Sequence, residues 1–348
     1  MKNKIVTFGE VLLRLSKKGT RRLIQTGDFV EHYGGSEANV AVSLSTLGDD
    51  VQYVTRVPDN AIGQAICLKM RTYGVNTNSF IYGGDRLGSY YFEEAAAMRN
   101  SSVVYDRKDS SFYSIQPGMI DWDHIFQDAG LFHFSGISCA ISQSAYYATF
   151  EAVKKARKQN LPISFDVNYR KNLWGYGAEP EDVLPFMAQQ ANIIFGDQHE
   201  FEVISGMKAV PFNALDDSFV MDKEAYRQYF EKVQAMYPKA STFLMAVRNQ
   251  IASSHHTLSG VLYDQGEVYV TRVYDIMPIV DPMGVGDAFI AAYLHAHRHW
   301  ADDPQKCLDF SLTASAMKNT IPGDFNLNTE DEIFEVLNAD GPFEYDIA

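Results

Sequence analysis

The chain has 348 residues, a formal net charge of −14 at pH 7, and a hydrophobic content of 46%. This length and apolar content are sufficient for a large folded domain with a substantial core. A nucleic-acid-binding surface requires clustered positive charge, so the acidic balance argues against that function and favours an ordinary soluble enzyme. No long apolar segment follows the N-terminus, so we expect neither a signal peptide nor a membrane span, and we expect a cytoplasmic protein.

The three cysteines predict a reducing environment rather than a disulfide framework. Cys67, Cys139 and Cys307 are widely separated, and each lies among apolar neighbours. This distribution suits buried free thiols, because a metal cluster or a set of disulfides would need grouped cysteines in a small or secreted chain. We therefore assign the cysteines no chemical role.

Strands and helices alternate along most of the chain. In chain order, periodicity predicts a strand at 5–8, a helix at 38–47, a strand at 51–54, a helix at 60–73, a strand at 131–135, a helix at 144–159, and strands at 163–167, 191–195 and 243–247. Gly48 and Gly74 follow the first two helices and suit their C-terminal caps. The alternation predicts an α/β fold with a mainly parallel sheet and helices on both faces, and we expect one domain over residues 1–348.

Two segments, 12–34 and 86–114, interrupt this alternation. They are rich in Tyr, Phe, Ser and Arg with strand-like spacing, and short strands are expected around Leu13 and Leu15 and at 23–24. We expect these segments to pair as a small sheet, called the lid here, that projects from the main sheet and covers a ligand. Because an exposed small sheet needs its hydrophobic face covered, we also hypothesise a dimer through the lid.

A glycine loop near the C-terminus predicts an anion pocket. The segment Asp281-Pro-Met-Gly-Val-Gly-Asp287 precedes an apolar helix that is expected from about residue 288. Gly284 and Gly286 allow the backbone to approach a ligand closely, and the helix start adds unpaired N–H groups and the positive end of its dipole. Asp287 has two interpretations here, either a helix cap or a base that accepts a proton from an attacking hydroxyl.

A second glycine turn lies near the N-terminus, where Gly34-Gly-Ser-Glu-Ala-Asn39 precedes the first predicted helix. Its glycines and small polar side chains predict a concave polar site at another helix N-terminus. The alternative is a simple loop with an N-terminal cap. A single glycine turn can occur by chance, but two such turns, one near each end of the chain, favour a binding function.

Together, these two segments resemble the signatures of the ribokinase/PfkB family of carbohydrate kinases. The resemblance covers essentially the whole chain and implies a ribokinase-like three-layer α/β/α sandwich, with ATP and Mg²⁺ as cofactors and a monovalent cation left open. It implies a sugar site formed by Gly34, Gly35, Ser36, Glu37, Ala38 and Asn39. It also implies an anion hole formed by Gly284, Val285, Gly286 and Asp287, with Asp287 as the catalytic base.

The segment Asp197-Gln-His-Glu200 is similar to the Asn-x-x-Glu motif of that family, with Asp197 in the place of Asn. The resemblance implies that Glu200 organises magnesium and its waters near the ATP phosphates, with Asp197 beside it. Hard oxygen ligands and retained water suit magnesium. The alternative is a solvated acidic helix start.

Within the family, the chain most resembles the 2-keto-3-deoxygluconate kinases. Asp166-Val-Asn168-Tyr-Arg170 is similar to their Asp-x-Asn-x-Arg segment, and Tyr105-Asp-Arg107 is similar to their lid element. By this resemblance Asn168 contacts the nucleotide, Arg170 lies between sugar acid and phosphate, and the substrate is held by Tyr90, Tyr105 and Arg107. Guanidinium groups pair with carboxylates, which favours a sugar acid. The alternative is that these arginines only solubilise the surface.

Three further segments carry weaker expectations. Arg248 and Asn249 follow a predicted strand and, by the resemblance, contact ATP, while residues 316–326 are expected to line the nucleotide pocket. His295, His297 and His299 are not expected to bind a metal, because alternate positions on a helix point in different directions.

The leading hypothesis is therefore ATP-dependent phosphorylation of 2-keto-3-deoxygluconate to its 6-phosphate. The same chemistry on fructose, ribose or 2-keto-3-deoxygalactonate is the first alternative. The second is a non-catalytic sugar-sensing protein, because a fold alone does not guarantee activity. The intact Asp287 argues against the second alternative.

Overall fold

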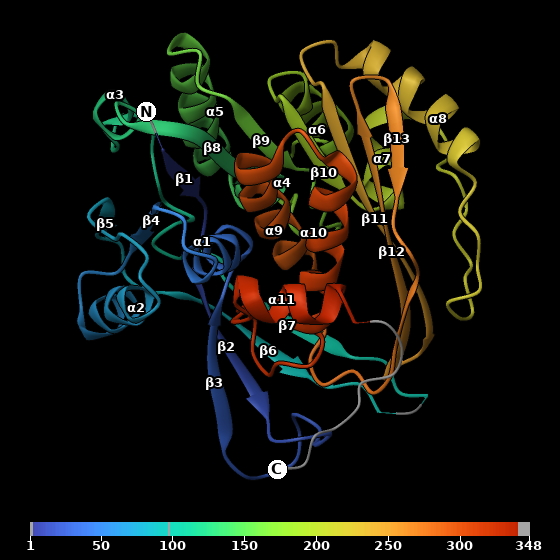
Figure 1. Cartoon of the computed structure of the whole chain (residues 1–348). Helices are drawn as coiled ribbons and strands as arrows, with labels where there is room; N and C mark the ends of the chain where they lie inside the picture. Colours follow the sequence, from blue (N-terminus) through green and yellow to red (C-terminus); the bar gives the residue numbers. More distant parts are fainter. Residues whose placement is uncertain (1–2, 97, 340–348) are drawn as a thin grey trace.

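The computed structural model describes residues 3–96 and 98–339, and a large mixed sheet forms its centre (Figure 1). The strand order is β13-β12-β11-β10-β9-β8-β1-β4-β5, with β14 paired to β12. The strands are β1 (Lys4–Phe8), β4 (Val51–Val57), β5 (Phe80–Tyr82), β8 (Ala129–Ser135), β9 (Ile163–Asp166), β10 (Ile193–Gly196), β11 (Thr242–Ala252), β12 (His255–Asp264), β13 (Glu267–Val270) and β14 (Tyr274–Ile276). All neighbours from β5 to β11 pair in parallel, and β12 is antiparallel to its partners. The sheet is therefore mainly parallel, as predicted.

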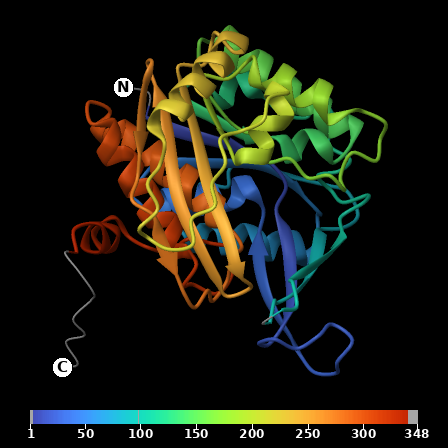
Figure 2. The same cartoon turned by 90° about the vertical axis from the view of Figure 1, so that its right-hand side faces the viewer.

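Helices cover both faces of this sheet (Figures 1 and 2). They are α1 (Ser36–Thr46), α2 (Ala61–Thr72), α3 (Trp122–Ile125), α4 (Gly136–Ala140), α5 (Gln143–Lys158), α6 (Pro180–Ala188), α7 (Gln198–Ser205), α8 (Lys223–Met236), α9 (Val285–Trp300), α10 (Pro304–Lys318) and α11 (Glu330–Leu337). Ile5 and Leu131 pack in the core under α1, α2, α9 and α10, while their neighbours Val6 and Phe132 pack in the core under α5 to α8. Burial on both faces explains the near-continuous apolar runs of these strands and confirms the three-layer α/β/α prediction.

The predicted lid is a separate four-stranded sheet of order β3-β2-β6-β7, which extends below the main sheet in Figure 1. Its strands are β2 (Leu12–Lys17), β3 (Phe29–Gly34), β6 (Gly88–Glu93) and β7 (Ser102–Asp106). The expected strand at 23–24 is wrong. Leu23 donates its N–H to Glu93 Oε2 over 2.9 Å and Ile24 is 84% exposed, so this segment forms a turn and pairs with no strand within residues 3–96 and 98–339.

The helix after the glycine loop begins at Val285, three residues before the expected position. Gly284 takes a left-handed conformation with φ of 77° and acts as the N-cap, which brings the loop's second glycine into the first helical turn. Asn60 caps α2 as well, accepting from the N–H groups of Ile62 and Gly63. Among the described residues, no helix has both the length and the apolar character needed to cross a bilayer.

Candidate active site

Two cavities meet at the carboxyl ends of the parallel strands, where ligands bind in open α/β sheets. The larger has a volume of about 410 Å³ and lies beside β9, β10 and the start of α7. The smaller, of about 90 Å³, lies between the lid and the start of α1. The residues that line both cavities are Asn168, Arg170, Met283, Gly284 and Asp287. The glycine loop therefore forms the boundary between two ligand-sized spaces.

Gly284 is required by close packing as well as by its backbone angle. A Cβ at this position would lie 1.9 Å from the carbonyl oxygen of Asp324. A Cβ on Gly286 would meet no atom within 4 Å, so the side of Gly286 is open to the larger cavity that it lines. Among the residues that the structure describes, no side chain caps α9, which leaves its first-turn N–H groups able to bind an anion.

Both carboxylate oxygens of Asp287 accept hydrogen bonds from α1. Ser36 Oγ donates to Asp287 Oδ1 over 2.8 Å, and Asn39 Nδ2 donates to Asp287 Oδ2 over 2.7 Å. The interpretation of Asp287 as a helix cap is wrong, because the N-cap is Gly284 and the Asp287 side chain bonds to another helix. The structure thus joins the two glycine-containing segments through one carboxylate, by bonds between residues 251 and 248 positions apart.

The surroundings of Asp287 suit a general base. Desolvation raises the pKa of Asp287, while the hydrogen bonds from Asn39 and Ser36 and the charge of Arg170 act in the opposite direction. The carboxylate is therefore more basic than an ordinary Asp, yet its neighbours are arranged to donate to its ionised form. This combination suits a group that accepts a proton from a hydroxyl.

Asn168 continues the same hydrogen-bond network toward β9. Its Nδ2 donates to Ser36 Oγ over 3.0 Å and to Asp166 Oδ2 over 2.7 Å. Its backbone has a φ of 39°, which is uncommon for a residue with a side chain. Within the described residues, its buried Oδ1 has no hydrogen-bond partner. A strained residue with an unpaired buried acceptor at the junction of two cavities indicates a ligand-facing position.

Asp197 and Glu200 form a capping box at the start of α7. Glu200 N–H donates to Asp197 Oδ1 over 2.8 Å, and Asp197 N–H donates to Glu200 Oε2 over 2.7 Å. Tyr169 N–H also donates to Glu200 Oε1 over 3.0 Å. Glu200 is buried in the wall of the larger cavity, so its interpretation as part of a solvated helix start is wrong. Burial, together with the charge of Asp197, raises the pKa of Glu200 to about 7.

The oxygen atoms of the larger cavity fit a magnesium ion. Asp166, Asp197 and Glu200 line it, and the unpaired Oδ1 of Asn168 lies in the same wall. Burial and the charges of Glu200 and Asp287 raise the pKa of Asp166 well above its usual range. A divalent cation would relieve this repulsion, and an oxygen-only set of ligands suits Mg²⁺.

Of the expected nucleotide contacts, Arg170 and Arg248 line the larger cavity and Asn249 does not. Among the described residues, the Arg170 guanidinium forms no ion pair or hydrogen bond, so it is free to bind a ligand. Strand β11 continues to Ala252, so Arg248 and Asn249 point to opposite faces. Asn249 Nδ2 instead donates to the Ala214 carbonyl over 2.7 Å, which corrects its expected role.

The lid contributes Tyr90, Tyr105 and Arg107 to the smaller cavity, as the sequence predicts. Arg107 Nε and Nη2 both donate to Glu10 Oε2, over 2.9 and 2.5 Å. Arg107 Nη1 has no hydrogen-bond partner among the described residues. Arg107 is thus not a free cation like Arg170, and Glu10, which sequence reasoning missed, fixes its orientation.

Only part of the segment 34–39 lines the smaller cavity, namely Gly35, Ser36 and Asn39. Glu37 and Ala38 are buried on the inner side of α1, which corrects their assignment to the sugar site. Glu37 Oε1 accepts from the Ser135 N–H and Oγ, both over 2.8 Å, and from Ser138 Oγ. Its role is therefore to hold α1 against β8 and α4.

Gly34 also lies outside the lining of the smaller cavity and has a packing role instead. A Cβ at this position would lie 2.1 Å from Asp324 Oδ1. The glycine therefore makes room for a carboxylate from the C-terminal part of the chain.

That carboxylate belongs to a buried ionic cluster which sequence reasoning missed. Arg14 Nη1 on β2 lies 2.8 Å from Asp281 Oδ2 and 3.0 Å from Asp324 Oδ2, and Tyr90 Oη donates to Asp324 Oδ1 over 2.6 Å. Asp281 also accepts from Met283 N–H over 3.1 Å. The cluster thereby links two lid strands to the start of the glycine loop. A signal was present in Leu13-Arg14-Leu15, where a charge interrupts an apolar run.

Residues 316–326 take a different place from the one expected. Asp324 lines the smaller cavity, and the adjacent Ser315 of α10 lines the larger one. The expectation that the whole segment lines the nucleotide pocket is therefore wrong, because Arg14 and Tyr90 hold Asp324 on the lid side.

The fold and the two cavities joined at an unsatisfied helix N-terminus define a small-molecule kinase of the ribokinase-like class. Residues 2–329 match the pfkB family of carbohydrate kinases, and the chain belongs to this family. The crystal structure of 2-dehydro-3-deoxygluconokinase from Thermotoga maritima is similar over 97% of this chain and 100% of its own, with 33% identity and a TM-score of 0.89.

Two relatives known by sequence are also similar over nearly the whole chain. The 2-dehydro-3-deoxygalactonokinase of Haloferax volcanii is 28% identical over 97% of this chain and 98% of its own length. The 2-dehydro-3-deoxygluconokinase of Thermoproteus tenax is 25% identical over 96% and 94%. The protein is a carbohydrate kinase, and membership of the family implies the use of ATP.

Proposed function

We propose that the protein transfers the terminal phosphoryl group of ATP to the terminal hydroxyl of 2-keto-3-deoxygluconate, which is also named 2-dehydro-3-deoxygluconate. The observation that carries this proposal is the position of Asp287 at the boundary of the two cavities. The larger cavity has room for a nucleotide, and the smaller one, under the lid, suits a sugar acid. The similarity to the kinase of Thermotoga maritima supports the same substrate class.

The residues divide the chemistry between them. Asp287 accepts the proton of the attacking hydroxyl, since both of its oxygens are already oriented by Ser36 and Asn39. The free N–H groups at the start of α9 and the unpaired guanidinium of Arg170 stabilise the charge that develops on the transferred phosphoryl group.

Magnesium fits the acidic wall of the larger cavity. Asp197 and Glu200 would hold it, in part through water, because both Glu200 oxygens already accept backbone hydrogen bonds. When bound, the ion would neutralise charge on the ATP phosphates. A monovalent cation stays a prediction, and activity in K⁺ compared with Na⁺ tests it.

The lid favours an anionic substrate. Glu10 fixes Arg107 through Nε and Nη2, and Nη1 has no partner in the described part of the chain, so Nη1 can donate to a carboxylate without first being reoriented. A second candidate substrate is 2-keto-3-deoxygalactonate, which the similarity to the kinase of Haloferax volcanii favours. These two acids are epimers and would present the same carboxylate to the lid.

A substrate panel tests the proposal. ADP release would be measured with Mg²⁺ and ATP for the two epimeric sugar acids, for 5-keto-2-deoxygluconate, and for fructose and ribose. We expect kcat/KM for one of the two epimers to exceed that of the neutral sugars by about 100-fold, the value of one or two charge-assisted hydrogen bonds. Equal or better turnover of a neutral sugar would contradict the proposal. Tight binding without any turnover would instead indicate a sugar sensor.

The proposal includes a dimer through the lid. Strand β7 is exposed along its whole length, and Val104 and Phe29, on the two edge strands, are 52% and 44% exposed. Exposed apolar edge strands tend to pair with another chain. Light scattering after size-exclusion chromatography should give about twice the chain mass of 39.1 kDa, whereas the mass of one chain would refute the dimer.

A further inference from the structure

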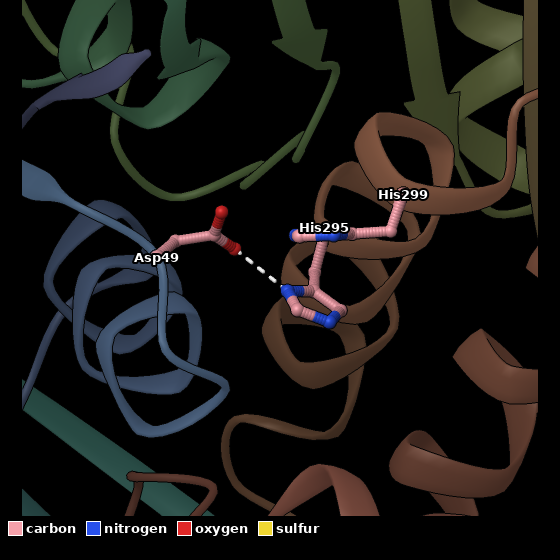
Figure 3. A group of neighbouring side chains, drawn as sticks. All are labelled: Asp49, His295 and His299. Carbon is pink, nitrogen blue, oxygen red and sulfur yellow. Dashed lines mark hydrogen bonds and ion pairs between the residues drawn. The ribbon is translucent and has the colours of Figure 1, made fainter.

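A second group of ionisable side chains lies near the C-terminal end of α9, about 12–18 Å along the helix from Asp287. His295 Nδ1 is 2.9 Å from Asp49 Oδ2, and His299 directs a ring nitrogen toward the same carboxylate (Figure 3). The three ligand atoms lie within 4.8 Å of one another. We propose that Asp49, His295 and His299 form a binding site for a transition-metal dication, with Zn²⁺ as the best-fitting ion.

Helical spacing explains why two of the three neighbouring histidines converge. His295 and His299 are four residues apart and therefore lie on the same face of α9. His297 points elsewhere and stacks on Tyr293, with ring centroids 5.6 Å apart and an angle of 15° between the rings. The sequence-based argument against a metal concerned alternate helix positions, and it does not apply to the pair that is one turn apart.

The contacts of His295 favour a cation at Nδ1. Nε2 lies 3.2 Å from Glu330 Oε2, so both ring nitrogens face carboxylate oxygens. A neutral imidazole carries one N–H, which would leave one nitrogen lone pair against a carboxylate. A metal on Nδ1, with Nε2–H donated to Glu330, gives each ring nitrogen of His295 a favourable partner. This is the usual arrangement of a metal-bound histidine. The competing arrangement is a doubly protonated ring without a metal.

The location adds further negative potential. Asp49 follows the C-terminal end of α1, and its N–H donates to the Leu44 carbonyl of that helix. His299 lies in the last turn of α9. Two helix C-termini, each the negative end of a dipole, therefore meet at this site and favour a bound cation.

The ligand set selects the class of metal. Two imidazole nitrogens and one carboxylate suit Zn²⁺, Co²⁺ or Ni²⁺, whereas Mg²⁺ prefers oxygen ligands. Ligand atoms around a tetrahedral Zn²⁺ lie about 3.3–3.5 Å apart, given bonds of about 2.0–2.1 Å. The site must therefore contract slightly, which the exposed side chain of His299 allows.

Arg298 opposes the metal. Its Nη1 lies 3.4 Å from Asp49 Oδ1, while Nη2 donates to the backbone carbonyl and side chain of Asn3. A positive charge at this distance weakens the binding of a cation. Removing the charge of Arg298 should therefore strengthen metal binding, so a variant at this position is expected to gain affinity.

Metal binding here would stabilise the base of the active site without taking part in the reaction. Helices α1 and α9 carry Ser36, Asn39 and Asp287 at their N-terminal ends and the proposed metal ligands at or just beyond their C-terminal ends. A shared metal would join the two helices. We expect a higher unfolding temperature with little change in kcat.

The test uses full-length protein without an affinity tag and without nucleotide. Calorimetric titration with Zn²⁺ should give one site that 5 mM Mg²⁺, about the level of a kinase assay, does not block. Zn²⁺ at about 100 times its Kd should raise Tm by about 3–5 °C. His299→Gln should weaken binding at least tenfold and Arg298→Gln should tighten it about threefold or more, while the control His297→Gln should leave it unchanged.

Other outcomes overturn the proposal. Absence of Zn²⁺ binding by the wild-type protein would mean that the cluster is a network of imidazolium and carboxylate groups. Zn²⁺ binding that His299→Gln leaves unchanged and Mg²⁺ displaces would place the ion at Asp197 and Glu200 instead.

Discussion

The base of the active site and the lid differ in how they are held. The base is formed by the starts of α1 and α9, which pack against the main sheet in a core that includes Ile5, Val40 and Phe289. The lid has a small apolar cluster of its own, which comprises Leu12, Tyr90 and Phe92 with Met283 packed against it, and its Leu13 and Tyr33 reach only the margin of the main core. Strand β7 of the lid is exposed along its length. Buried polar contacts such as Arg14 with Asp281 and Asp324 therefore matter more for the lid than for the base, which is held mainly by the core.

This difference suggests a division of work. Asp287, Ser36 and Asn39 belong to helices whose positions are fixed by packing, which favours the accurate geometry that proton and phosphoryl transfer require. Tyr105 lies in the lid sheet and Arg107 directly after its strand β7, and both line the smaller cavity, which favours selection and enclosure of the substrate. Substitutions in the base should therefore lower kcat, and substitutions in the lid should raise KM or lower the stability of the protein.

The largest effect is expected for Asp287→Asn. The isosteric amide keeps the shape of the site but cannot accept the hydroxyl proton, so kcat should fall by about 10²–10⁴-fold while substrate binding persists. ADP release and calorimetric binding of the sugar acid would measure the two quantities. Asp303→Asn, which should still cap α10, is the control. A kcat within threefold of the wild type would show that Asp287 is not the base.

The next effect is expected for Arg14→Met, which breaks the link between lid and glycine loop. Asp281 and Asp324 would remain buried without their partner, at a cost of about 3–5 kcal/mol, or about 4–7 °C in Tm for a chain of this length. The exposed lid residue Arg22, changed to Met, is the control, and its loss should be under about 1 kcal/mol.

The pH dependence of this defect adds a second readout. Burial raises the pKa of Asp324 in the folded protein, although Arg14 opposes this effect. A carboxyl group with a raised folded pKa destabilises the fold as it ionises, so stability falls as pH rises through that pKa. The deficit of Arg14→Met should therefore be larger at pH 8 than at pH 5. A deficit that grows as pH falls would contradict the ionic explanation.

For the lid, Arg107→Ala should raise KM for the sugar acid by about 10–100-fold, because one charge-assisted contact is lost. A neutral sugar lacks the carboxylate, so its KM should change much less. Steady-state kinetics with both substrates would separate these effects. Arg86→Ala, on another lid arginine that bonds to the Lys108 and Asp106 carbonyls outside the cavity, is the matched control. Equal changes for acid and neutral sugars would refute the acid assignment.

The smallest effect concerns the Mg²⁺ requirement. Because burial and Asp197 raise the pKa of Glu200 to about 7, this carboxyl group is mostly protonated at pH 6 and mostly ionised at pH 8. Metal binding favours the ionised form, so the half-saturating Mg²⁺ concentration should be about tenfold higher at pH 6. Protonation of ATP also weakens Mg²⁺ binding at the lower pH. In Glu200→Gln, the difference in half-saturating Mg²⁺ between pH 6 and pH 8 should shrink to this contribution from ATP. An unchanged difference would exclude Glu200 from the metal site.

The sequence predicted what depends on local pattern. Alternating strands and helices indicated the parallel sheet, and the glycine loop indicated an anion site, because backbone angle and helix ends are encoded by neighbouring residues. The contacts made by Asp287 could not be anticipated from local pattern, since Ser36 and Asn39 are 251 and 248 residues away.

The rest depends on contacts that no local pattern contains. Arg14 and Asp324 are 310 residues apart, and their pairing follows from where the lid meets the loop after α10. Glu37 lies in the same motif as Ser36, but its position on the helix turns it toward Ser135 and away from the cavity. Asn249 is separated from the nucleotide cavity because β11 is longer than expected.

The most direct test of the central claim is a structure with the sugar acid, Mg²⁺ and a nonhydrolysable ATP analogue. We expect the terminal hydroxyl oxygen about 2.6–3.2 Å from an Asp287 carboxylate oxygen, with the terminal phosphate against the N–H groups at the start of α9. The sugar acid should occupy the smaller cavity under the lid. A terminal hydroxyl out of reach of Asp287, or a phosphate bound away from the glycine loop, would contradict the account.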